Sequence, residues 1–428
     1  MRGADNYLST IEDSGFLMII PVVILAIVFL LTAVRQVGNM RLEIWQIMSL
    51  GALMVLLTDQ ISITDAVDAV NIDVMFFLFG MFIIGQALEM SGYLSHLSYR
   101  FFKNAGSIDA VILYILFGMG FASAFLMNDT LAIIGTPVVL LLAKEHRIEP
   151  KLLLMALAFA VTTGSVISPI GNPQNLLIAL GSDMNNPFLT FIQQLLLPTA
   201  INLFIAYLFL KISYKEHFTS SSLNHTKQPI TDARLAGLSR ISLGLVVLLV
   251  CIKIMVALSG LQFDIKLTYI AMISALPILL LSKRRKEVLK NMDWHTLTFF
   301  AAMFILMESV WDTGFFQNAI NGSGVDITAT AVILPISVFL SQFISNVPLV
   351  ALYMPILSHA NVTTGGLLAL AAGSTIAGNL SILGAASNVI IIQNAERKGN
   401  VSLGFIEFAR VGIPLTITQV FVYWLFLS

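Results

Sequence analysis

A short polar stretch at residues 168–175, Ser-Pro-Ile-Gly-Asn-Pro-Gln-Asn, interrupts a segment that is apolar on both sides. Residues 152–166 before it have the composition of a helix, and residues 176–180 after it are apolar again. Gly171 and Pro173 therefore predict a helix that is broken in the middle of a membrane crossing. Backbone that unwinds at this depth is tolerated only where protein or a water-filled cavity satisfies its N–H and C=O groups.

The second half of the chain repeats this feature. Residues 381–388, Ser-Ile-Leu-Gly-Ala-Ala-Ser-Asn, are followed by the apolar residues 389–392. Two broken helices at corresponding positions of two halves are typical of a transport site that lies between those halves. The sequence therefore predicts such a site.

The composition is that of a polytopic membrane protein. Hydrophobic residues make up 57% of the chain and charged residues 11%, with a mean hydropathy of +0.89, whereas soluble domains have about 25% charged residues. The net charge of -1 gives no reason to expect a nucleic-acid partner. The single cysteine, Cys251, excludes an internal disulfide and a cysteine metal cluster. We find no paired nucleophile and base, so we predict that the chain is not an enzyme.

Positively charged loops predict the orientation of ten membrane crossings, because cytoplasmic loops carry an excess of Lys and Arg. The strongest cytoplasmic marker is the basic run at residues 283–286, and the acidic loop at residues 59–73 is predicted outside. Both chain termini are also predicted outside. The predicted crossings are residues 16–34, 43–57, 74–94, 152–180, 188–210, 241–257, 267–281, 294–311, 365–394 and 411–427.

Two further apolar segments are predicted to be re-entrant hairpins, which enter the membrane and return to the same side. Residues 108–143 have basic residues at both flanks, which places both ends in the cytoplasm and the tip at residues 127–130. Residues 327–357 lie in a stretch without Lys or Arg and should begin and end outside, with the tip at residues 345–348. The alternative for the first segment is two full crossings joined by an external Asn-Asp turn.

The two halves align as an internal repeat, and because each half has five crossings, the second half is inverted relative to the first. The predicted fold class is an all-α polytopic membrane protein with two inverted repeats, each of five transmembrane helices, one of them broken at the midplane, plus one re-entrant hairpin. Residues 1–210 form the first repeat, residues 211–240 a cytoplasmic linker and residues 241–428 the second repeat. The key aligned pairs are Asn128 with Asn346, Gly171 with Gly384, and Asn175 with Asn388.

A half-helix is predicted to begin near the bilayer centre at each hairpin tip and each break. Helix N-termini favour anions through their free N–H groups, and the unwound carbonyl groups before them suit a cation such as Na⁺. Asparagine amides can donate to an oxyanion and accept from a hydroxyl group. The other interpretation is that these side chains only cap the half-helices. The predicted substrate-binding residues are Asn128, Thr130, Asn172, Asn175, Asn346, Ser387 and Asn388.

Asp129 breaks the symmetry of the repeat, because its counterpart is Val347. A carboxylate at membrane depth is costly and is by default functional. We predict that Asp129 binds and releases the coupling proton; the alternative is a capping carboxylate with a structural role only. A permanent negative charge here would oppose an anionic substrate unless it were protonated or paired, which favours a neutral or proton-exchanged solute.

With these residues in hand, the sequence resembles, over essentially its whole length, the ion transporter superfamily of arsenite permeases, NhaD-type sodium/proton antiporters and divalent-anion/sodium symporters. The tips Met127-Asn128-Asp129 and Ser345-Asn346-Val347 lie where the symporters carry Ser-Asn-Thr. In that superfamily the tip Ser and Asn bind Na⁺ together with carbonyl groups of the break. The resemblance implies Na⁺ ligands at Ser123, Asn128 and Gly171 for one site, and at Ser341, Ser345, Asn346 and Gly384 for the other.

The first tip departs from the symporter pattern, because Met127 replaces the tip Ser and Asp129 the tip Thr. The Asn128-Asp129 pair followed by Thr136-Pro137 is similar to the arsenite permeases, which the resemblance implies are proton-coupled exporters. The intact Gly-Asn-Pro-Gln-Asn break is instead similar to the anion-permease branch.

The sequence thus predicts a secondary active transporter that moves a small anion or an arsenite-like oxyacid by alternating access, coupled to protons. The alternatives are a sodium-coupled dicarboxylate or sulfate symporter, a sodium/proton antiporter and, from another class, an anion channel. No cofactor is predicted beyond Na⁺ or H⁺ as the coupling ion. We expect an integral protein of a prokaryotic cytoplasmic (inner) membrane, in contact with lipid, and the family resemblance implies a homodimer.

Overall fold

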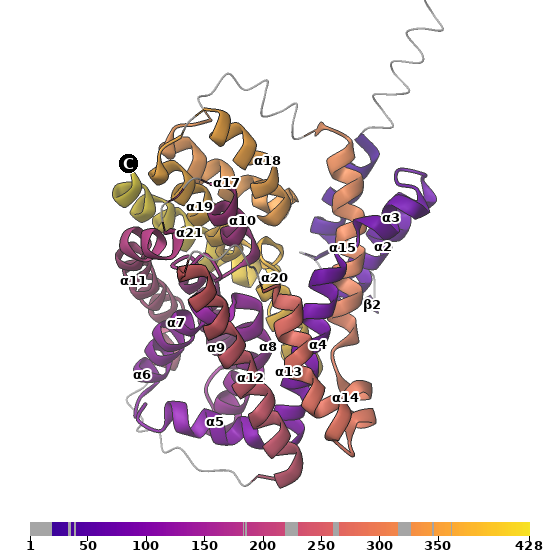
Figure 1. Ribbon diagram of the computed structural model, residues 1–428, viewed down its shortest axis with the longest axis vertical. Coiled ribbons are helices and arrows are strands. Elements are labelled where there is room, and N and C mark those ends of the chain that lie inside the picture. Colours follow the sequence, from indigo (N-terminus) through magenta and orange to yellow (C-terminus); the bar gives the residue numbers. More distant parts are fainter. Residues whose placement is uncertain are drawn as a thin grey trace, which may run out of the picture. The chain divides into compact units, whose positions relative to one another are not determined.

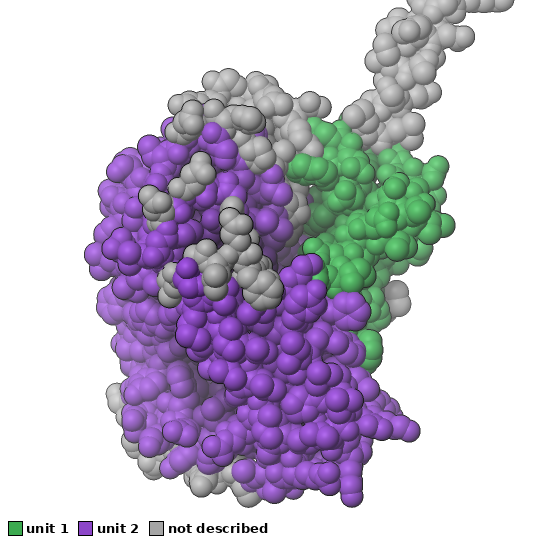
Figure 2. Space-filling model, in the orientation of Figure 1, with its two compact units in different colours: residues 1–75, 294–326 green, residues 76–293, 327–428 purple. Residues whose placement is uncertain are grey.

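The computed structural model describes residues 19–32, 36–37, 40–182, 184, 186–218, 230–259, 265–315, 327–344, 346–360 and 362–428. The chain divides into two compact units, which Figure 2 distinguishes by colour. Unit 1 consists of residues 1–75 and 294–326, and unit 2 of residues 76–293 and 327–428.

Unit 1 is built around helix α15. In α2, Trp45 stacks on His295 of α15, with ring centroids 4.7 Å apart. Gly51 of α2 lets Leu306 of α15 approach, since a Cβ atom at position 51 would lie 3.1 Å from the Leu306 side chain. The elements are an apolar helix at Ile19–Thr32, the antiparallel strands β1 (Gln36–Val37) and β2 (Met40–Arg41), and helices α2 (Ile44–Leu57), α3 (Ile63–Ala69) and α15 (Trp294–Asp312).

Unit 2 holds the helices that follow in the chain, most of which are labelled in Figure 1. Helix α4 (Ile72–Met90) begins at the end of unit 1 and continues in unit 2. The further helices are α5 (Tyr93–Phe102), α6 (Ile108–Leu113), the π-helix η1 (Tyr114–Met119), α7 (Gly120–Leu126), α8 (Asn128–His146), α9 (Pro150–Ser165), α10 (Pro173–Gly181), α11 (Pro187–Ser213), η2 (Lys215–His217), α12 (Ala233–Leu258), α13 (Leu267–Leu281), α14 (Arg285–Asn291), α17 (Thr330–Ile344), α18 (Asn346–His359), α19 (Thr364–Leu380), η3 (Ile382–Gly384), α20 (Ala386–Gly399) and α21 (Phe405–Leu427).

Helices α9 and α19 are the centre of unit 2. Every residue from Leu152 to Ser165 in α9 and from Leu368 to Asn379 in α19 is buried. Such helices have no polar face, which is the pattern of a helix enclosed by protein on all sides. The two pack against each other, α9 also against α7, α8 and α11, and α19 also against α17, α18 and α21. Each central helix is therefore covered mainly by helices of its own half, and it also packs against the half-helix that follows the other break, α20 for α9 and α10 for α19.

The helices are broken at the predicted positions. Between α9 and α10 the chain is not helical from residue 166 to residue 172, and between α19 and α20 only the short turn η3 intervenes. In the first predicted hairpin, Met127 separates α7 from α8 and adopts a φ of 65°. In the second, α17 ends at Ile344 and α18 begins at Asn346.

Several of these helices have the length and composition of membrane spans. Among the described residues, five are long and apolar enough to cross a membrane, at Ile72–Met90, Ile108–Leu126, Pro187–Ser213, Ala233–Val256 and Phe405–Leu427. Shorter apolar helices occupy Ile19–Thr32, Ile44–Leu57, Pro150–Ser165, Leu267–Leu281, Thr330–Phe343 and Leu349–Ser358.

Two boundaries differ from the prediction. The crossing predicted over residues 74–94 ends at Met90, because Gly92 adopts a positive φ of 75° that stops the helix, and the separate helix α5 follows. The predicted linker at residues 211–240 is shorter than expected, since α11 extends to Ser213 and α12 begins at Ala233.

Gly164 provides the first test of this packing. A Cβ atom at position 164 would lie 2.1 Å from the carbonyl oxygen of Gly120, where α9 meets α7. We therefore expect Gly164→Ala to lower the free energy of unfolding by about 1–3 kcal/mol through overpacking, measured as a lower melting temperature in detergent. Gly244→Ala in α12 is the control, because no atom lies within 4 Å of its added Cβ. Equal melting temperatures for the two variants would contradict this packing.

Candidate functional site

An asparagine side chain closes each helix break. In both breaks its Nδ2 atom donates to two backbone carbonyl groups, which lie ten and seven residues earlier in the chain. These carbonyl groups have lost their helical partners, and the amide supplies the missing donor inside an apolar environment. The acceptors are Ser165 and Ser168 for Asn175, at 3.2 Å each, and Gly378 and Ser381 (3.3 Å) for Asn388.

The two aligned glycines permit a close approach of backbone at each break. A Cβ atom on Gly171 would lie 2.1 Å from the carbonyl oxygen of Ser165. A Cβ atom on Gly384 would lie 2.4 Å from the carbonyl oxygen of Ala377. Both positions therefore exclude any side chain, which explains why each break contains a glycine four residues before its asparagine.

The N-terminus of α8 lies against both breaks. The backbone N–H of Asn128 donates to the carbonyl oxygen of Gly171 at 3.0 Å. Its side-chain Nδ2 donates to Oγ of Ser387, in the first turn of α20, at 3.5 Å. The tip of the first predicted hairpin thus joins the first break to the second.

Asp129 and Thr130 follow in the first turn of α8 and are buried. Asp129 is 8% exposed, and its Oδ1 atom is buried without a hydrogen-bond partner among the described residues. In the described part of the chain it forms no ion pair with a lysine, arginine or histidine. A buried unpaired carboxylate costs free energy, and taking up a proton relieves that cost.

Asn172 connects the first break to α19. Its Oδ1 accepts from the N–H of Asn175 at 2.9 Å and so caps α10, as predicted. Its Nδ2 donates to Oγ of Ser165 at 3.2 Å and to Oγ1 of Thr375 at 3.0 Å. Oγ1 of Thr375 donates in turn to Oδ1 of Asn175 at 3.3 Å.

The structure corrects the capping interpretation for α8 and α20. The N-cap of α8 is Met127 and that of α20 is Ala385, and neither forms a side-chain cap bond. Asn128 is the first residue of α8, and Ser387 and Asn388 follow Ala386, the first residue of α20, so all three lie inside a first turn. Their side chains therefore serve contacts between helices.

Thr375 was not predicted as a site residue, although the sequence contains a signal for it. Thr162 and Thr375 each lie 13 residues before the asparagine of their break. The bond from Thr375 to Asn175 would correspond, in the other half, to a bond from Thr162 to Asn388. Instead, Oγ1 of Thr162 and Oδ1 of Asn388 are both buried without a partner among the described residues. Both halves thus have a threonine and an asparagine at the same spacing. Of the two equivalent bonds, the structure forms the one from Thr375 to Asn175.

The implied Na⁺ ligands of the first half are only partly brought together. Asn128 and Gly171 are in contact, as described above. Oγ of Ser123 donates to the carbonyl oxygens of Gly120 at 2.7 Å and Val161 at 3.0 Å. Ser123 therefore joins α7 to α9 and does not bond to Asn128 or Gly171 in the described residues.

In the second half, two implied ligands have free oxygen atoms. Oγ of Ser341 and Oδ1 of Asn346 are buried without a hydrogen-bond partner in the part of the chain that the structure describes, and Ser345 lies outside it. Gln342, which was not predicted, accepts from Oγ of Ser381 at 2.7 Å and donates to the carbonyl oxygen of Ala377 at 2.9 Å beside Gly384. Uncharged oxygen atoms of this kind fit the ligand preference of a hard cation.

These helices, with two broken crossings around a buried polar centre, define a polytopic membrane transporter. The chain belongs to the citrate transporter family (CitMHS), which matches residues 27–367. This result confirms the predicted resemblance to the ion transporter and divalent-anion permease superfamily.

Similar proteins include an uncharacterized transporter of Mycobacterium bovis (Mb2703), which is 29% identical over 366 residues covering 81% of this chain and 83% of that protein. The silicon efflux transporter LSI3 of Oryza sativa subsp. japonica is 26% identical over 86% of this chain and 89% of its own length. The human P protein is 23% identical over 86% of this chain and 54% of its own length.

The crystal structure of the YdaH transporter of Alcanivorax borkumensis shares the fold. It covers 97% of both chains with a TM-score of 0.50 and 12% sequence identity.

The role of Asn175 as a donor can be tested by Asn175→Asp. The variant keeps the shape of the side chain but cannot donate to the carbonyl groups of the break, so we expect a loss of about 1–3 kcal/mol of stability, seen as a lower melting temperature. Asn71→Asp is the matched control, because Oδ1 of Asn71 only accepts from the N–H of Val74 and Asp caps equally well. An unchanged melting temperature for Asn175→Asp would contradict the assigned hydrogen bonds.

Proposed function

We propose that the protein is a proton-coupled secondary transporter of a prokaryotic inner membrane, which moves a small oxyacid or its anion by alternating access. The observation that carries the proposal is the contact of the first turn of α8, which contains Asp129, with both helix breaks through Asn128. The family is named for citrate and the rice relative for silicon efflux. The support for the solute class comes from the hydrogen-bond donors of the site.

The site supports a solute that is rich in oxygen atoms. The N-termini of α8 and α20 lie next to each other at the bond between Asn128 and Ser387. Helix N-termini offer N–H donors, and the amides of Asn128 and Asn388 add donors that carry no net charge. Such donors stabilise an oxyanion and also bind a neutral oxyacid, whose hydroxyl groups can donate to the amide oxygen atoms.

Asp129 links solute binding to protonation. In its charged form it repels an anion bound at the N-terminus of α8, and no cationic side chain among the described residues offsets this repulsion. In its neutral form it removes the repulsion and can donate a hydrogen bond. Solute and proton therefore favour each other's binding, which is the linkage that a coupled transporter needs.

The unequal threonine bonds support alternating access by two inverted halves. An inverted repeat lets the protein exchange the conformations of its halves, so that the cavity faces one side and then the other. In that exchange, the bond from Thr375 to Asn175 would break and the equivalent bond from Thr162 to Asn388 would form. The buried unpaired oxygen atoms of Thr162 and Asn388 are the groups that this second state satisfies.

A sodium-coupled mechanism is the second candidate. It is favoured by the unpaired oxygen atoms of Ser341 and Asn346, which suit Na⁺ ligation next to the break at Gly384. Under this alternative, coupling would belong to the second half of the chain, and Asp129 would be dispensable for it.

Asp129→Asn separates the two candidates. We expect proteoliposomes with the wild-type protein to accumulate one of arsenite, sulfate, citrate or a C4-dicarboxylate in response to an imposed proton gradient, with saturating kinetics. The gradient-driven uptake rate of the variant should be at least about tenfold lower, because the other predicted substrate-binding residues are Asn, Thr and Ser and do not titrate. Asp109→Asn is the control, since Asp109 pairs with Lys211 at 2.6 Å. Sodium-driven uptake that survives Asp129→Asn would assign the coupling to Na⁺, and flux that does not saturate would indicate a channel.

Thr375→Val and Thr162→Val should shift the protein in opposite directions. Thr375→Val removes a bond that exists in the described conformation and destabilises it, whereas Thr162→Val removes an unsatisfied hydroxyl group and stabilises it. A hydrogen bond between membrane helices contributes about 0.6 kcal/mol, so each substitution should change the ratio of the described conformation to the exchanged conformation roughly threefold. The measurement uses a cysteine in place of Leu140, which lines a cavity at the C-terminal end of α8, in a Cys251→Ala background. The alkylation rate is recorded with reagent added from the cytoplasmic side, and rates that move in the same direction in the two variants would contradict the exchange.

A further inference from the structure

A cavity of about 640 Å³ lies at the ends of α8 and α20 that are remote from the candidate site. Its wall is formed by the C-terminal half of α8, including Leu140 and Lys144, by Lys398 at the end of α20, and by Glu89 at the end of α4. All of these residues belong to unit 2.

The same two helices connect the cavity to the candidate site. Helices α8 and α20 pack against each other, and their N-termini meet at the bond between Asn128 and Ser387. Their C-terminal ends reach the cavity at Lys144 and Lys398. A solute in the cavity therefore contacts the helices whose first turns form the site.

The charged groups of the cavity give it a net positive charge. Nζ of Lys398 forms an ion pair with Oε2 of Glu89, so these two charges offset each other. Lys144 is exposed and has no ion-pair partner among the residues that the structure describes. A concave surface with an excess of positive charge concentrates anions.

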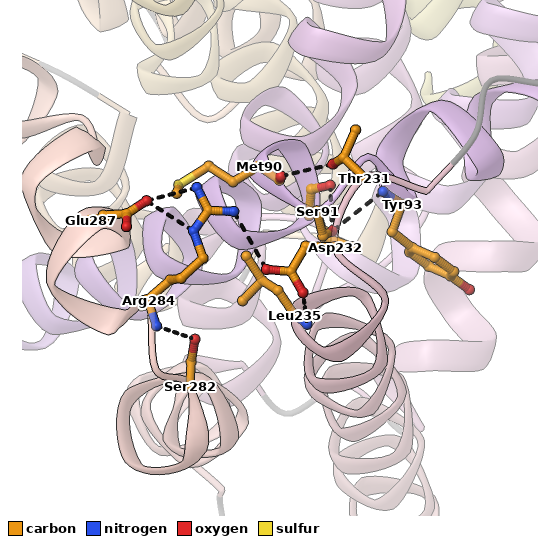
Figure 3. Close-up of polar contacts among 10 residues, drawn as sticks. Met90, Ser91, Tyr93, Thr231, Asp232, Leu235, Ser282, Arg284 and Glu287 are labelled. Atoms are coloured by element: carbon orange, nitrogen blue, oxygen red, sulfur yellow. Dashed lines mark hydrogen bonds and ion pairs between the residues drawn. The ribbon is translucent and has the colours of Figure 1, made fainter.

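Glu89 lies at the end of α4. The residues just before α12 form hydrogen bonds with this end of the helix (Figure 3). The N–H of Thr231 donates to the carbonyl oxygen of Ser91 at 3.0 Å, and its Oγ1 donates to the carbonyl oxygen of Met90 at 3.2 Å. Asp232 is in turn paired with Arg284 at 3.4 Å. Glu89 thus projects from an anchored helix end, whereas Lys398 is at the far end of a helix that begins at the site.

The charge on Asp232 keeps this anchor in place at neutral pH. The backbone N–H of Leu235 is the main group that lowers the pKa of its carboxyl, burial opposes this effect, and the guanidinium of Arg284 lowers the pKa further. The anchor is therefore charged under the conditions in which transport is measured.

We propose that this cavity is the cytoplasmic vestibule of the transport site and binds small anions, which displace Glu89 from Lys398 on their way to the site. The cytoplasmic side follows from the excess of Lys and Arg in cytoplasmic loops: Lys144 flanks the segment 108–143, whose ends are predicted in the cytoplasm, and Arg397 and Lys398 directly follow the predicted crossing 365–394. The inference rests on the proposed function and extends it, because it identifies the anionic form of the solute as the species that enters.

A structural role for the two lysines is the competing explanation. Both lie in the last turn of a helix, where a positive charge is favoured by the helix dipole. In that case their removal would lower stability and leave the charge preference of the cavity unchanged.

The test compares two thiol reagents of similar size and opposite charge at a cysteine in the cavity. The reporter is Leu140→Cys in a Cys251→Ala background, with Leu141→Cys as a second reporter, in inside-out vesicles. The reagents are the anionic 2-sulfonatoethyl and the cationic 2-(trimethylammonio)ethyl methanethiosulfonate. We expect the ratio of anionic to cationic rates to fall about fivefold in Lys398→Gln combined with Lys144→Gln, and to rise in Glu89→Gln.

Lys211→Gln, which removes a lysine that is paired with Asp109 outside the cavity, should leave the ratio unchanged. A ratio that is unaffected by the cavity substitutions would overturn the proposal, as would reaction of neither reporter from the cytoplasmic side. The assay needs no transported solute, so its failure is distinguishable from a failure of proton-coupled uptake.

Discussion

Polar backbone groups inside a membrane must find partners within the protein, and this constraint shapes the centre of the molecule. Interrupting α9 and α19 frees carbonyl groups that lipid cannot satisfy. The side chains of Asn175 and Asn388 satisfy them through the same pair of bonds, at the same spacing. Each break is therefore a stable structure in which polar groups can face a solute.

The constraint explains why the surrounding helices have the residues they have. Gly171 and Gly384 allow backbone to approach backbone, and Gly164 allows α9 to lie against Gly120. The close packing brings the N-terminus of α8 to within hydrogen-bond distance of both breaks. Helix dipoles and amide groups are then directed at one location, which also contains the buried carboxylate Asp129. The proposed transport chemistry thus depends on how the broken backbone is satisfied.

Much of this arrangement could be predicted from the sequence. Glycine, proline and asparagine within apolar segments indicate where the helices break, and the structure interrupts the helices at these positions. The sides of the membrane assigned from basic residues stay a prediction. The pairing of Asn175 with Asn388 followed from the alignment of the halves, and the structure gives the two residues equivalent bonds.

What could not be predicted were contacts between distant elements. Thr375 lies in a helix with ordinary composition, and only the fold brings it to Asn172 and Asn175, about 200 residues earlier. The end of α4 was misplaced because the positive φ of Gly92 is a property of local backbone that hydropathy does not report. The pair of Glu89 with Lys398 likewise depends on where two helices end in space.

We propose that Asp129 carries the proton that moves with the solute. The most direct test records proton flux with an internal pH-sensitive dye while solute flux is measured in the same proteoliposomes. We expect a constant ratio of protons to solute for the wild type, and for Asp129→Asn solute-for-solute exchange without any accompanying proton flux. A variant that still moves protons in the wild-type ratio would contradict it.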